Sequence, residues 1–393
     1  MANGVIGLYI DTQEQLNDFI ARCSKADFIT VDTEFLREKT YYPKLCLIQI
    51  ATSEVEAIID PLGDLDIKAL APIFSDPAIT KVFHAGDQDR SILYNALGVI
   101  VRPLFDTQRA VMLLGLPQQM SLSSIVKRFC DVNLKKSESF SDWSQRPLTD
   151  KQLSYALDDV HYLPEIYKRI VDDLKQAGRL EWFLEDVRSF EEIESYEQDK
   201  YDVWKRLKGI SSIKGRSLAV VREVAAWRET AAQKRDLPRK WILSDEFLVE
   251  AARKLPRSTD ELYEIRGMKE RLNERLSAEL IEAVAKGKAT PESEWPQREQ
   301  PVITGFGAAA TIDMLSALLH HRSHQLEIAS TYLTNHDELV RLAAGQRKGL
   351  AILKGWRKQL LGVELLALLD GGISLSVRNR ELVVTHNCAD TAL

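Results

Sequence analysis

Two carboxylates stand side by side at the end of a short apolar run, in the stretch FITVDTEF. Residues two apart in a β-strand point to the same face, so we expect Asp32 and Glu34 to project together. Paired carboxylates repel each other unless a cation lies between them, and ligands that are all oxygen favour a hard cation such as Mg²⁺ or Mn²⁺. On its own, however, an Asp-x-Glu pair is more often a solvated strand end than a metal site.

Two other motifs place carboxylates at expected helix positions. The run HAGDQD lies where an apolar strand turns into a helix, and there Asp87 and Asp89 also fit the role of plain helix caps. Tyr155 and Asp159 are four residues apart and therefore share one face of a helix. That pair is either a buried hydrogen bond or a metal ligand beside a phenol that orients water.

The elements that must position these motifs can be read from the periodicity of the chain. We expect, in chain order, strands over 28–31, 45–51 and 55–60, a helix over 67–74, a strand over 79–84, a helix over 87–97, a short strand at 104–105 and a helical run over 150–176 capped by Thr149. Three hairpin-linked strands followed by strand–helix alternation indicate an α/β domain with a mixed sheet.

Beyond about residue 200 the strand pattern disappears. Residues 203–286 show only helical periods, 289–307 read as a linker rich in Pro, Glu and Gly, and 311–386 are helical again up to a short hairpin expected at Arg378-Asn379. Both helical parts contain a helix, an N-cap and a second helix in that order. This echo favours two copies of one module, although two unrelated small bundles would share it by chance.

Length and composition bound the class of protein. A chain of 393 residues is expected to form two to three domains, and 45% hydrophobic with 28% charged residues is typical of a globular protein. No apolar run reaches the roughly 20 residues of a membrane span, and the N-terminus lacks the features of a secretion signal. The four scattered cysteines suit reduced thiols, so we expect no membrane association and a cytoplasmic location.

The charge is distributed unevenly along the chain, whose net charge is −6. Residues 1–200 contain 22 Lys and Arg against 33 Asp and Glu, a net charge of −11. Residues 201–288 contain 20 against 14, a net of +6, and residues 289–393 contain 10 against 11, a net of −1. A basic middle part often binds the phosphate backbone of nucleic acids, although a solvated helical face would give the same count.

The three motifs together follow the order of the tyrosine-containing branch of the DEDD exonuclease superfamily: Asp-x-Glu on a first strand, Asp at a later helix start and Tyr-x-x-x-Asp on a late helix. The stretches FITVDTEFLREKTYYPKLCLIQIA, KVFHAGDQDRSIL, FDTQ and DWSQRPLTDKQLSYALDDVHYLPEIY resemble the ribonuclease D family. LPRKWILSDEFLVEAARKLPRSTDELYEIRGM, within 203–286, resembles the helicase-and-RNase-D C-terminal (HRDC) domain, and 311–386 resemble a diverged second copy.

The resemblance implies an α/β fold, with a ribonuclease H-like mixed-sheet exonuclease domain followed by two all-α HRDC-type bundles. The expected ranges are 1–200 for the exonuclease domain, 203–288 for the first bundle, 289–310 for the linker and 311–393 for the second bundle. The implied activity is that of a 3′→5′ exoribonuclease, which releases nucleoside 5′-monophosphates from RNA 3′ ends. Its implied substrates are precursors of tRNA and other structured RNAs.

The resemblance also implies two divalent cations, Mg²⁺ or Mn²⁺, shared by four carboxylates. Asp32 matches the ligand of both cations, and Glu34 and Asp159 match further ligands on the side of the nucleophile. Asp89 matches the ligand on the side of the leaving group, and Tyr155 matches the residue that orients the attacking water.

The second motif departs from the family pattern. The family more often has an acidic residue directly before the aspartate and an apolar one directly after it, whereas this chain reads DQDR. Aligning the preceding His-Ala pair selects Asp89 and leaves Asp87 as the alternative. Trp143 and Arg146, just before the catalytic helix, fit equally well as RNA contacts and as packing residues, and His84 fits better as a packed residue than as a ligand.

The basic middle part is expected to hold the RNA backbone through its cations. The residues expected to do so are Lys205, Lys208, Lys214, Arg216, Lys234 and Arg235. Backbone contacts carry no base code, so binding should depend on salt and little on sequence. The last part is expected to close a ring or groove around the RNA, and without an oligomerisation heptad the default expectation is a monomer.

Two other functions compete with this one. A DNA exonuclease would use the same active site, although no polymerase or helicase region accompanies it here. A catalytically silent RNA-binding scaffold is the second alternative, but all five motif positions keep competent side chains. The scaffold predicts that Asp32→Asn leaves function intact, whereas a nuclease requires its loss.

Overall fold

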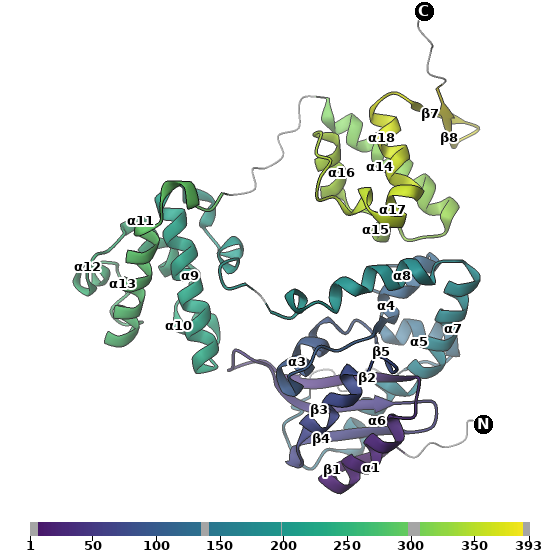
Figure 1. Ribbon diagram of the computed structural model, residues 1–393, viewed down its shortest axis with the longest axis horizontal. Helices are drawn as coiled ribbons and strands as arrows, with labels where there is room; N and C mark the ends of the chain where they lie inside the picture. The colour runs from purple at the N-terminus through teal and green to yellow at the C-terminus, as the bar shows by residue number, and fades with distance from the viewer. Residues whose placement is uncertain (1–6, 135–140, 198, 298–306, 388–393) are drawn as a thin grey trace, which may run out of the picture.

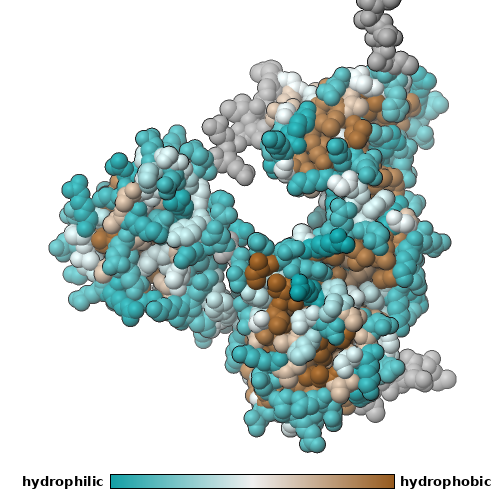
Figure 2. All heavy atoms as spheres, viewed as in Figure 1, coloured by the Kyte–Doolittle hydropathy of each residue, from teal (hydrophilic) through white to brown (hydrophobic). Residues whose placement is uncertain are grey.

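The computed structural model describes residues 7–134, 141–197, 199–297 and 307–387. Figure 1 shows three units, which we call the N-terminal unit (7–197), the middle unit (199–297) and the C-terminal unit (307–387). The C-terminal unit lies against the N-terminal unit, and the middle unit stands to one side of both. The side chains leave an opening between the three units (Figure 2).

Among the described residues, the N-terminal unit is built on a six-stranded mixed sheet in the order β1-β4-β3-β2-β5-β6. The strands are β1 (Leu8–Thr12), β2 (Phe28–Leu36), β3 (Lys44–Ala51), β4 (Glu56–Asp64), β5 (Thr80–Phe83) and β6 (Leu104–Asp106). The predicted antiparallel meander of β2, β3 and β4 is confirmed, while β1 pairs with β4, and β5 and β6 extend the sheet from β2, all in parallel. The sequence did not predict β1, because Ile10 is its one buried residue.

The two faces of β2 serve different purposes. Ile29 and Val31 point into an apolar core that also contains residues of α1. The alternate residues face α6 instead, and there the hydroxyl of Thr30 donates to the carbonyl of Val160 over 3.2 Å. Because side chains alternate between the two faces, β2 can contribute to the apolar core on one face and present carboxylates on the other.

Helices cover the sheet on both sides. They are α1 (Gln13–Cys23), α2 (Ala71–Ser75), α3 (Asp87–Leu97), α4 (Thr107–Ala110), α5 (Leu122–Cys130), α6 (Asp150–His161), α7 (Leu163–Gln176) and α8 (Leu180–Val187). Thr149 caps α6 as predicted, in a capping box with Gln152. The run expected over 150–176 is two helices, because the chain turns at Tyr162 and Pro164 starts α7, where its missing N–H is tolerated.

The middle unit is a helical bundle with its own apolar core. Its helices are α9 (Arg216–Arg235), α10 (Arg239–Ile242), α11 (Asp245–Lys254), α12 (Thr259–Tyr263) and α13 (Glu274–Ala289). The long helices α9 and α13 approach closely at Gly287, where a Cβ atom would lie 2.5 Å from Val220 Cα. Glycine is therefore required at that crossing.

The C-terminal unit combines helices with a hairpin. Its elements are α14 (Ala308–Leu326), α15 (Ser330–Leu333), α16 (His336–Ala343), α17 (Gly355–Arg357), α18 (Val363–Leu369), β7 (Ile373–Arg378) and β8 (Glu381–His386). The expected hairpin is confirmed, with Asn379 and Arg380 at φ values of 51° and 70° in a two-residue turn. Helix α14 begins three residues before the expected start of this unit at 311.

The middle and C-terminal units repeat one order of elements. The 20-residue α9 and the 19-residue α14 both end in a left-handed residue, Asp236 and Glu327, each at a φ of 48°. A four-residue helix follows in each case, α10 or α15, and then α11 or α16. The echo in the sequence therefore corresponds to a shared arrangement of helices.

The C-terminal unit shares one continuous apolar core with the N-terminal unit. Arg357 forms a bidentate ion pair with Asp186 at 2.6 and 2.9 Å. Beside it, the rings of Trp182 and Trp356 stack with their centroids 5.1 Å apart. These two units are therefore packed as one body at this joint.

Within the described ranges, we find no helix that combines the length and the apolar character of a membrane span.

Candidate active site

Three carboxylates converge between the sheet and α6 of the N-terminal unit. Asp32 and Glu34 extend from the same face of β2, and Asp159 extends from α6, which packs across that face. One oxygen from each carboxylate lies within 4.8 Å of the other two. Oxygens at this spacing can bind one hard cation together. The alternation of β2 thus places Asp32 and Glu34 together as predicted, and the fold adds a ligand from a distant part of the chain.

Asp89 reaches the same place from the edge of β2. Strand β5 pairs with β2 only as far as Thr30, so the chain that leaves β5 brings the first turn of α3 beside the rest of β2. There the hydroxyl of Thr33 donates a hydrogen bond to the buried carboxylate of Asp89. The turn needs Gly86, since a Cβ atom there would lie 2.5 Å from Phe83 Cβ.

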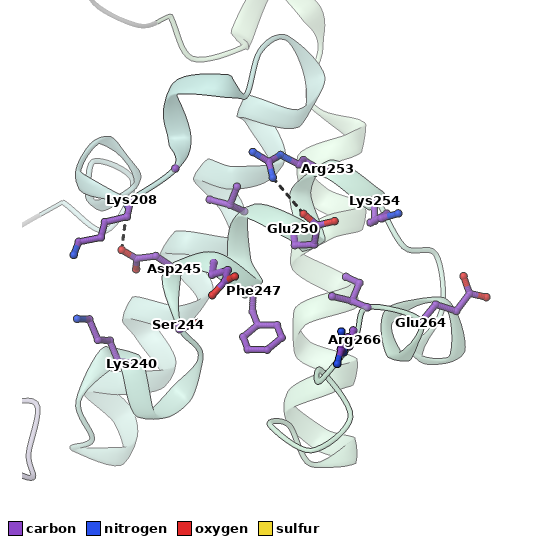
Figure 3. Close-up of a pocket in the computed structure, with 14 residues that line it drawn as sticks. Lys208, Lys240, Ser244, Asp245, Phe247, Glu250, Arg253, Lys254, Glu264 and Arg266 are labelled. Atoms are coloured by element: carbon purple, nitrogen blue, oxygen red, sulfur yellow. Dashed lines mark hydrogen bonds and ion pairs between the residues drawn. The ribbon is translucent and has the colours of Figure 1, made fainter.

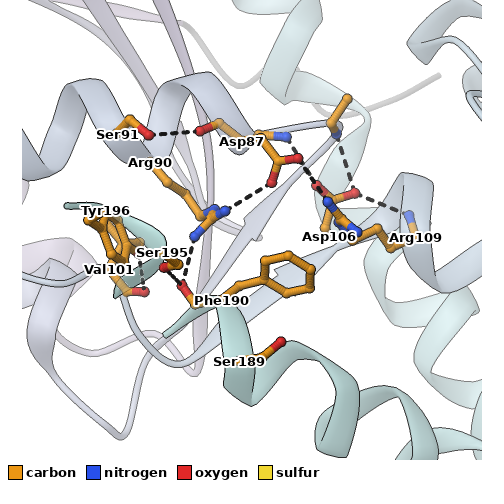
Figure 4. Close-up of polar contacts among 12 residues, drawn as sticks. Asp87, Arg90, Ser91, Val101, Asp106, Arg109, Ser189, Phe190, Ser195 and Tyr196 are labelled. Carbon is orange, nitrogen blue, oxygen red and sulfur yellow. Dashed lines mark hydrogen bonds and ion pairs between the residues drawn. The ribbon is translucent and has the colours of Figure 1, made fainter. Parts of the chain in front are cut away.

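Asp87, the alternative for the second motif, is occupied elsewhere (Figure 4). Its carboxylate accepts hydrogen bonds from Arg90 over 2.9 Å and from Arg109 over 2.8 Å. Burial alone would raise the pKa of Asp87, but the bonds and charges of the two arginines outweigh it and lower that pKa. Of the two aspartates, Asp89 is the one that the structure brings to the carboxylate cluster.

The carboxylates perturb one another strongly. Burial, and after it the charges of Asp89, Asp159 and Glu34, raises the pKa of Asp32 well above its usual range. Burial with the charges of Asp159 and Asp89 raises the pKa of Glu34 to about 8. Burial with the charges of Asp158 and Asp89 raises the pKa of Asp159 to about 7. The pKa of Asp89 is also raised, mainly by burial. The cluster therefore resists ionisation until positive charge is supplied.

Tyr155 lies one helical turn before Asp159 on the same side of α6. Its partly buried ring packs beside Leu47 of β3, and its centroid is 6.0 Å from that of Trp143. The bond from Thr30 to the Val160 carbonyl holds this part of α6 on β2. Tyr155 and Asp159 thus share one face of α6, as the Tyr-x-x-x-Asp spacing predicted.

The segment before α6 is held by Arg146, whose side chain bonds to the sheet instead of pointing into solvent. Trp143 is buried, and Arg146 donates to both carboxylate oxygens of Asp60 and to the carbonyl of Cys46. Tyr9 of β1 donates to Asp60 as well. Of the two roles left open for Trp143 and Arg146, the structure shows packing.

Polar residues around the β5–α3 turn are structural. Nε2 of His84 and Nε2 of Gln108 both donate to the carbonyl of Met120, over 2.9 and 3.0 Å. Asp106 accepts from the backbone N–H of Gly86 over 3.0 Å. Burial lowers the pKa of His84, which is the packed residue that we expected. Together these bonds fix the loop from which Asp89 projects.

Sequence reasoning missed the two threonines that orient the site. Thr33 stands between the two carboxylates of β2, and its hydroxyl meets Asp89, which approaches from the edge of this strand. Thr30 fixes α6 through its hydroxyl. The strand alternation was the available signal for both, but nothing local indicates which distant element each hydroxyl meets.

The six basic residues expected to bind RNA are spread along the first part of the middle unit. Lys205, Lys208 and Lys214 precede α9 in the chain and Lys234 lies near its end, while Arg216 and Arg235 are the first and last residues of this helix, about 28 Å apart along its axis. Lys205 pairs with Asp202 over 2.6 Å. Lys208 lines an open cavity of about 900 Å³ (Figure 3). Its other labelled cations are Lys240, Arg253, Lys254 and Arg266.

Comparison with known proteins agrees with this geometry. Residues 8–175 match the 3′-5′ exonuclease domain family, and residues 217–284 match the HRDC domain family. The chain is 37% identical over 383 residues to the ribonuclease D of Sphingobium indicum, which covers 96% of this chain and 98% of that protein. It is 36% identical over 369 residues to the ribonuclease D of Zymomonas mobilis, covering 93% of this chain and 94% of that protein.

Solved structures give the same picture. The crystal structure of Escherichia coli RNase D, described as an exoribonuclease involved in structured RNA processing, matches 93% of this chain and 99% of its own, with a TM-score of 0.80 at 30% identity. The catalytic core of RRP6 from Trypanosoma brucei matches 74% of this chain and 83% of its own, with a TM-score of 0.53 at 27% identity.

Proposed function

Because the chain belongs to the ribonuclease D family and is a 3′→5′ exoribonuclease, we propose that it works with two divalent cations, Mg²⁺ or Mn²⁺, held by four carboxylates. Each cycle would hydrolyse the last phosphodiester bond of an RNA and release a nucleoside 5′-monophosphate. The observation that carries the proposal is the convergence of Asp32, Glu34 and Asp159 within 4.8 Å, with Asp89 beside them.

The residues present fit such cations. The donors are carboxylate oxygens, which suit hard cations such as Mg²⁺ and Mn²⁺. The raised pKa values of Glu34, about 8, and Asp159, about 7, reflect burial first and then the repulsion among these groups. A divalent charge at this place would relieve that repulsion and keep every carboxylate ionised near neutral pH.

The chain's own residues would divide the work between binding and orientation. Asp32 would hold both cations, Glu34 and Asp159 would hold the one on the side of the nucleophile, and Asp89 the one on the side of the leaving group. When bound, two such cations supply a hydroxide nucleophile and stabilise the attacking and leaving oxygens of an in-line displacement. The Thr33 hydroxyl, which donates to Asp89, would keep that carboxylate in one orientation.

Tyr155 would position the water that loses a proton and attacks the phosphorus of the last phosphodiester bond. A phenol ordinarily titrates near pH 10 and so keeps its proton at neutral pH, which favours orienting water over acting as a general base. The ring lies beside that of Trp143, with the centroids 6.0 Å apart, and Tyr155 shares the face of α6 that carries Asp159. A fixed phenol beside the nucleophile-side carboxylate suits this role.

The uneven charge of the chain fits the same function. Residues 1–200 carry a net charge of −11, which would repel RNA, but cations at the carboxylates would invert the local field. The middle unit, where residues 201–288 carry +6, would attract the phosphate backbone through several of its cations.

The substrates that we propose are precursors of tRNA and other structured RNAs with unpaired 3′ tails. Support comes from the E. coli structure, whose protein is described as acting in structured RNA processing. We further propose a monomer with a cytoplasmic location, where the free thiols of Cys23, Cys46 and Cys130 would stay reduced.

A gel time course tests the proposal. RNA and DNA single strands of the same sequence, labelled at the 5′ end, are incubated with Mg²⁺, Mn²⁺ or EDTA, and a further RNA carries a 3′ tail beyond a tRNA-like stem. We expect stepwise shortening of RNA from the 3′ end that needs a divalent cation and is lost in Asp32→Ala. Faster loss of DNA would move the function to DNA ends, and no digestion of either strand would refute catalysis.

A further inference from the structure

The loop between β2 and β3, residues 37–43, attaches the middle unit to the N-terminal unit. The Tyr41 ring packs in a small apolar cluster of the middle unit, and its hydroxyl donates to the buried carboxylate of Glu229. The same hydroxyl accepts hydrogen bonds from Gln233 over 3.1 Å and from Arg239 over 3.2 Å. The hydroxyl of Tyr41 thus meets three side chains of the middle unit.

The backbone of this loop is held too. The N–H groups of Tyr41 and Tyr42 both donate to one carboxylate oxygen of Asp236, each over 3.0 Å. Asp236 is the left-handed residue that ends α9, so the contact is made by the end of the longest helix of the middle unit. The strand that carries Asp32 and Glu34 is therefore tied directly to this unit.

A cavity of about 610 Å³ lies between this contact and α3. Three cations line it: Arg37 from the N-terminal unit, and Lys200 and Arg239 from the middle unit. Tyr42 also lines it; this residue is 39% exposed, and its ring lies edge-on to that of Tyr41 with the centroids 4.8 Å apart. A volume of this size lies within the range of about 300–1,000 Å³ that is usual for sites of small molecules.

The acidic groups that line the cavity already have partners. Asp87 pairs with two arginines, and Glu197 accepts a hydrogen bond from the hydroxyl of Tyr94 over 2.6 Å. By contrast, Arg37 and Lys200 form no ion pair with any residue in the described ranges. The positive charges of Arg37 and Lys200 thus outnumber the negative charge of Glu197, which its phenol partner does not cancel, and the net positive charge suits a phosphate group.

The cavity adjoins the catalytic elements without containing the carboxylates. Arg37 directly follows β2, which ends three positions after Thr33, and Gln88 of the lining is the neighbour of Asp89 on α3. The segment that leaves the N-terminal unit forms one wall of the cavity. Arg90 holds it, because its guanidinium donates to the Phe190 carbonyl over 2.8 Å and stacks on the Tyr196 ring (Figure 4). This wall of the cavity is therefore held in place, and the cavity lies beside β2 and α3, which carry carboxylates of the active site.

We propose that this cavity is a second RNA-binding subsite, which holds one nucleotide of the single strand upstream of the bond that is cut. Arg37 and Lys200 bind its phosphate, and the Tyr42 ring stacks on its base. Docking of Tyr41 in the middle unit completes the subsite, because that contact brings Arg239 to it. The inference rests on the proposed function and adds to it the place where the RNA is held upstream of the bond that is cut.

The test compares RNAs of different length. The values of kcat/KM are measured with Mg²⁺ for a dinucleotide and for progressively longer single strands, using the wild-type chain, Tyr42→Ala and Arg37→Ala. Loss of one stacked base or one phosphate contact corresponds to about a tenfold weaker interaction. We expect the ratio of kcat/KM for long RNA to that for the dinucleotide to fall about tenfold in either variant.

Conservative variants and a distant one serve as controls. Tyr42→Phe keeps the ring and Arg37→Lys keeps the charge, so both should restore most of the length dependence. Lys175→Ala removes an exposed cation of α7, far along the chain from the cavity, and should leave the ratio as in the wild type. For Arg37→Ala, the salt dependence of RNA affinity should also become shallower, by about 0.7 in the slope of log K against log salt.

A binding measurement keeps the inference separate from catalysis. Affinity for a labelled long strand is measured by fluorescence anisotropy in EDTA, where hydrolysis does not interfere. We expect about a tenfold weaker affinity for Tyr42→Ala. Unchanged affinity and unchanged length dependence would overturn the subsite, as would an equal loss on RNAs of every length. A wild-type chain that binds RNA through Tyr42 but hydrolyses nothing would instead refute the proposed function and leave the subsite standing.

Discussion

Replacing Asp159 by Asn should stabilise the protein when divalent cations are removed. Burial and the charges of Asp158 and Asp89 raise the pKa of Asp159 to about 7 in the folded chain. In an unfolded chain, an aspartate has a pKa of about 3.9. The folded state therefore holds this proton more tightly, so stability falls as the pH rises from about 4 to about 7 and stays at that lower level above it. Asn carries no charge and removes this penalty.

The magnitude follows from the two pKa values. A difference between about 7 and about 3.9 corresponds to roughly 4 kcal/mol at a pH above both. Asp32, Glu34 and Asp89 titrate together with Asp159, so part of that penalty remains when one charge is removed. We therefore expect Asp159→Asn to raise the free energy of unfolding by about 2 kcal/mol near pH 8, and by clearly less near pH 5.

Urea unfolding in EDTA at both pH values measures the effect, with Asp172→Asn on the exposed side of α7 as the matched control. The control should change stability by no more than about 0.5 kcal/mol. Adding Mg²⁺ or Mn²⁺ should make the wild type more stable than Asp159→Asn, because the cation binds the folded wild type more tightly than it binds the variant. If Asp159→Asn were no more stable than the control in EDTA near pH 8, the crowding of charge that we infer would be wrong.

Three further outcomes follow from the structure. Tyr155→Phe should lower kcat by about a hundredfold with little change in KM, as single-turnover hydrolysis would show, and wild-type kcat in that variant would refute the orienting role. Arg357→Ala removes the bidentate partner of Asp186, so thermal unfolding should show a loss of about 2 kcal/mol, whereas an unchanged midpoint would mean that the joint does not depend on this pair. RNA affinity of the wild type should fall steeply with salt and depend little on base sequence, and a flat salt titration would contradict binding through the phosphate backbone.

Local patterns were sufficient to predict most of the strands and helices and the two residue pairs that share a face, one on β2 and one on α6. The alternation of β2 placed Asp32 and Glu34 on one face, and the four-residue spacing placed Tyr155 beside Asp159. The cap at Thr149 fixed the start of α6. Each of these depends on residues close in sequence, whose relation is set by the geometry of one strand or one helix.

Contacts between distant segments could not be predicted in the same way. Thr33 meets Asp89, and Tyr41 meets Asp236, only because strand order and unit packing bring them together. Nothing in the local pattern of either residue identifies its partner. The placement of the basic residues stayed open for the same reason, because charge counts along a chain do not reveal that Arg216 and Arg235 stand at opposite ends of one helix.

The most direct test of the carboxylate site compares two substitutions on one helix, Asp87→Asn and Asp89→Asn. Hydrolysis of a 5′-labelled single-stranded RNA is followed with Mg²⁺ for both variants and for the wild type. We predict that Asp87→Asn keeps activity within about threefold, because the Asp87 carboxylate pairs with Arg90 and Arg109 and does not join the carboxylate cluster, and that Asp89→Asn loses about a thousandfold or more. An active Asp89→Asn variant, or an inactive Asp87→Asn variant that remains folded, would contradict the site described here.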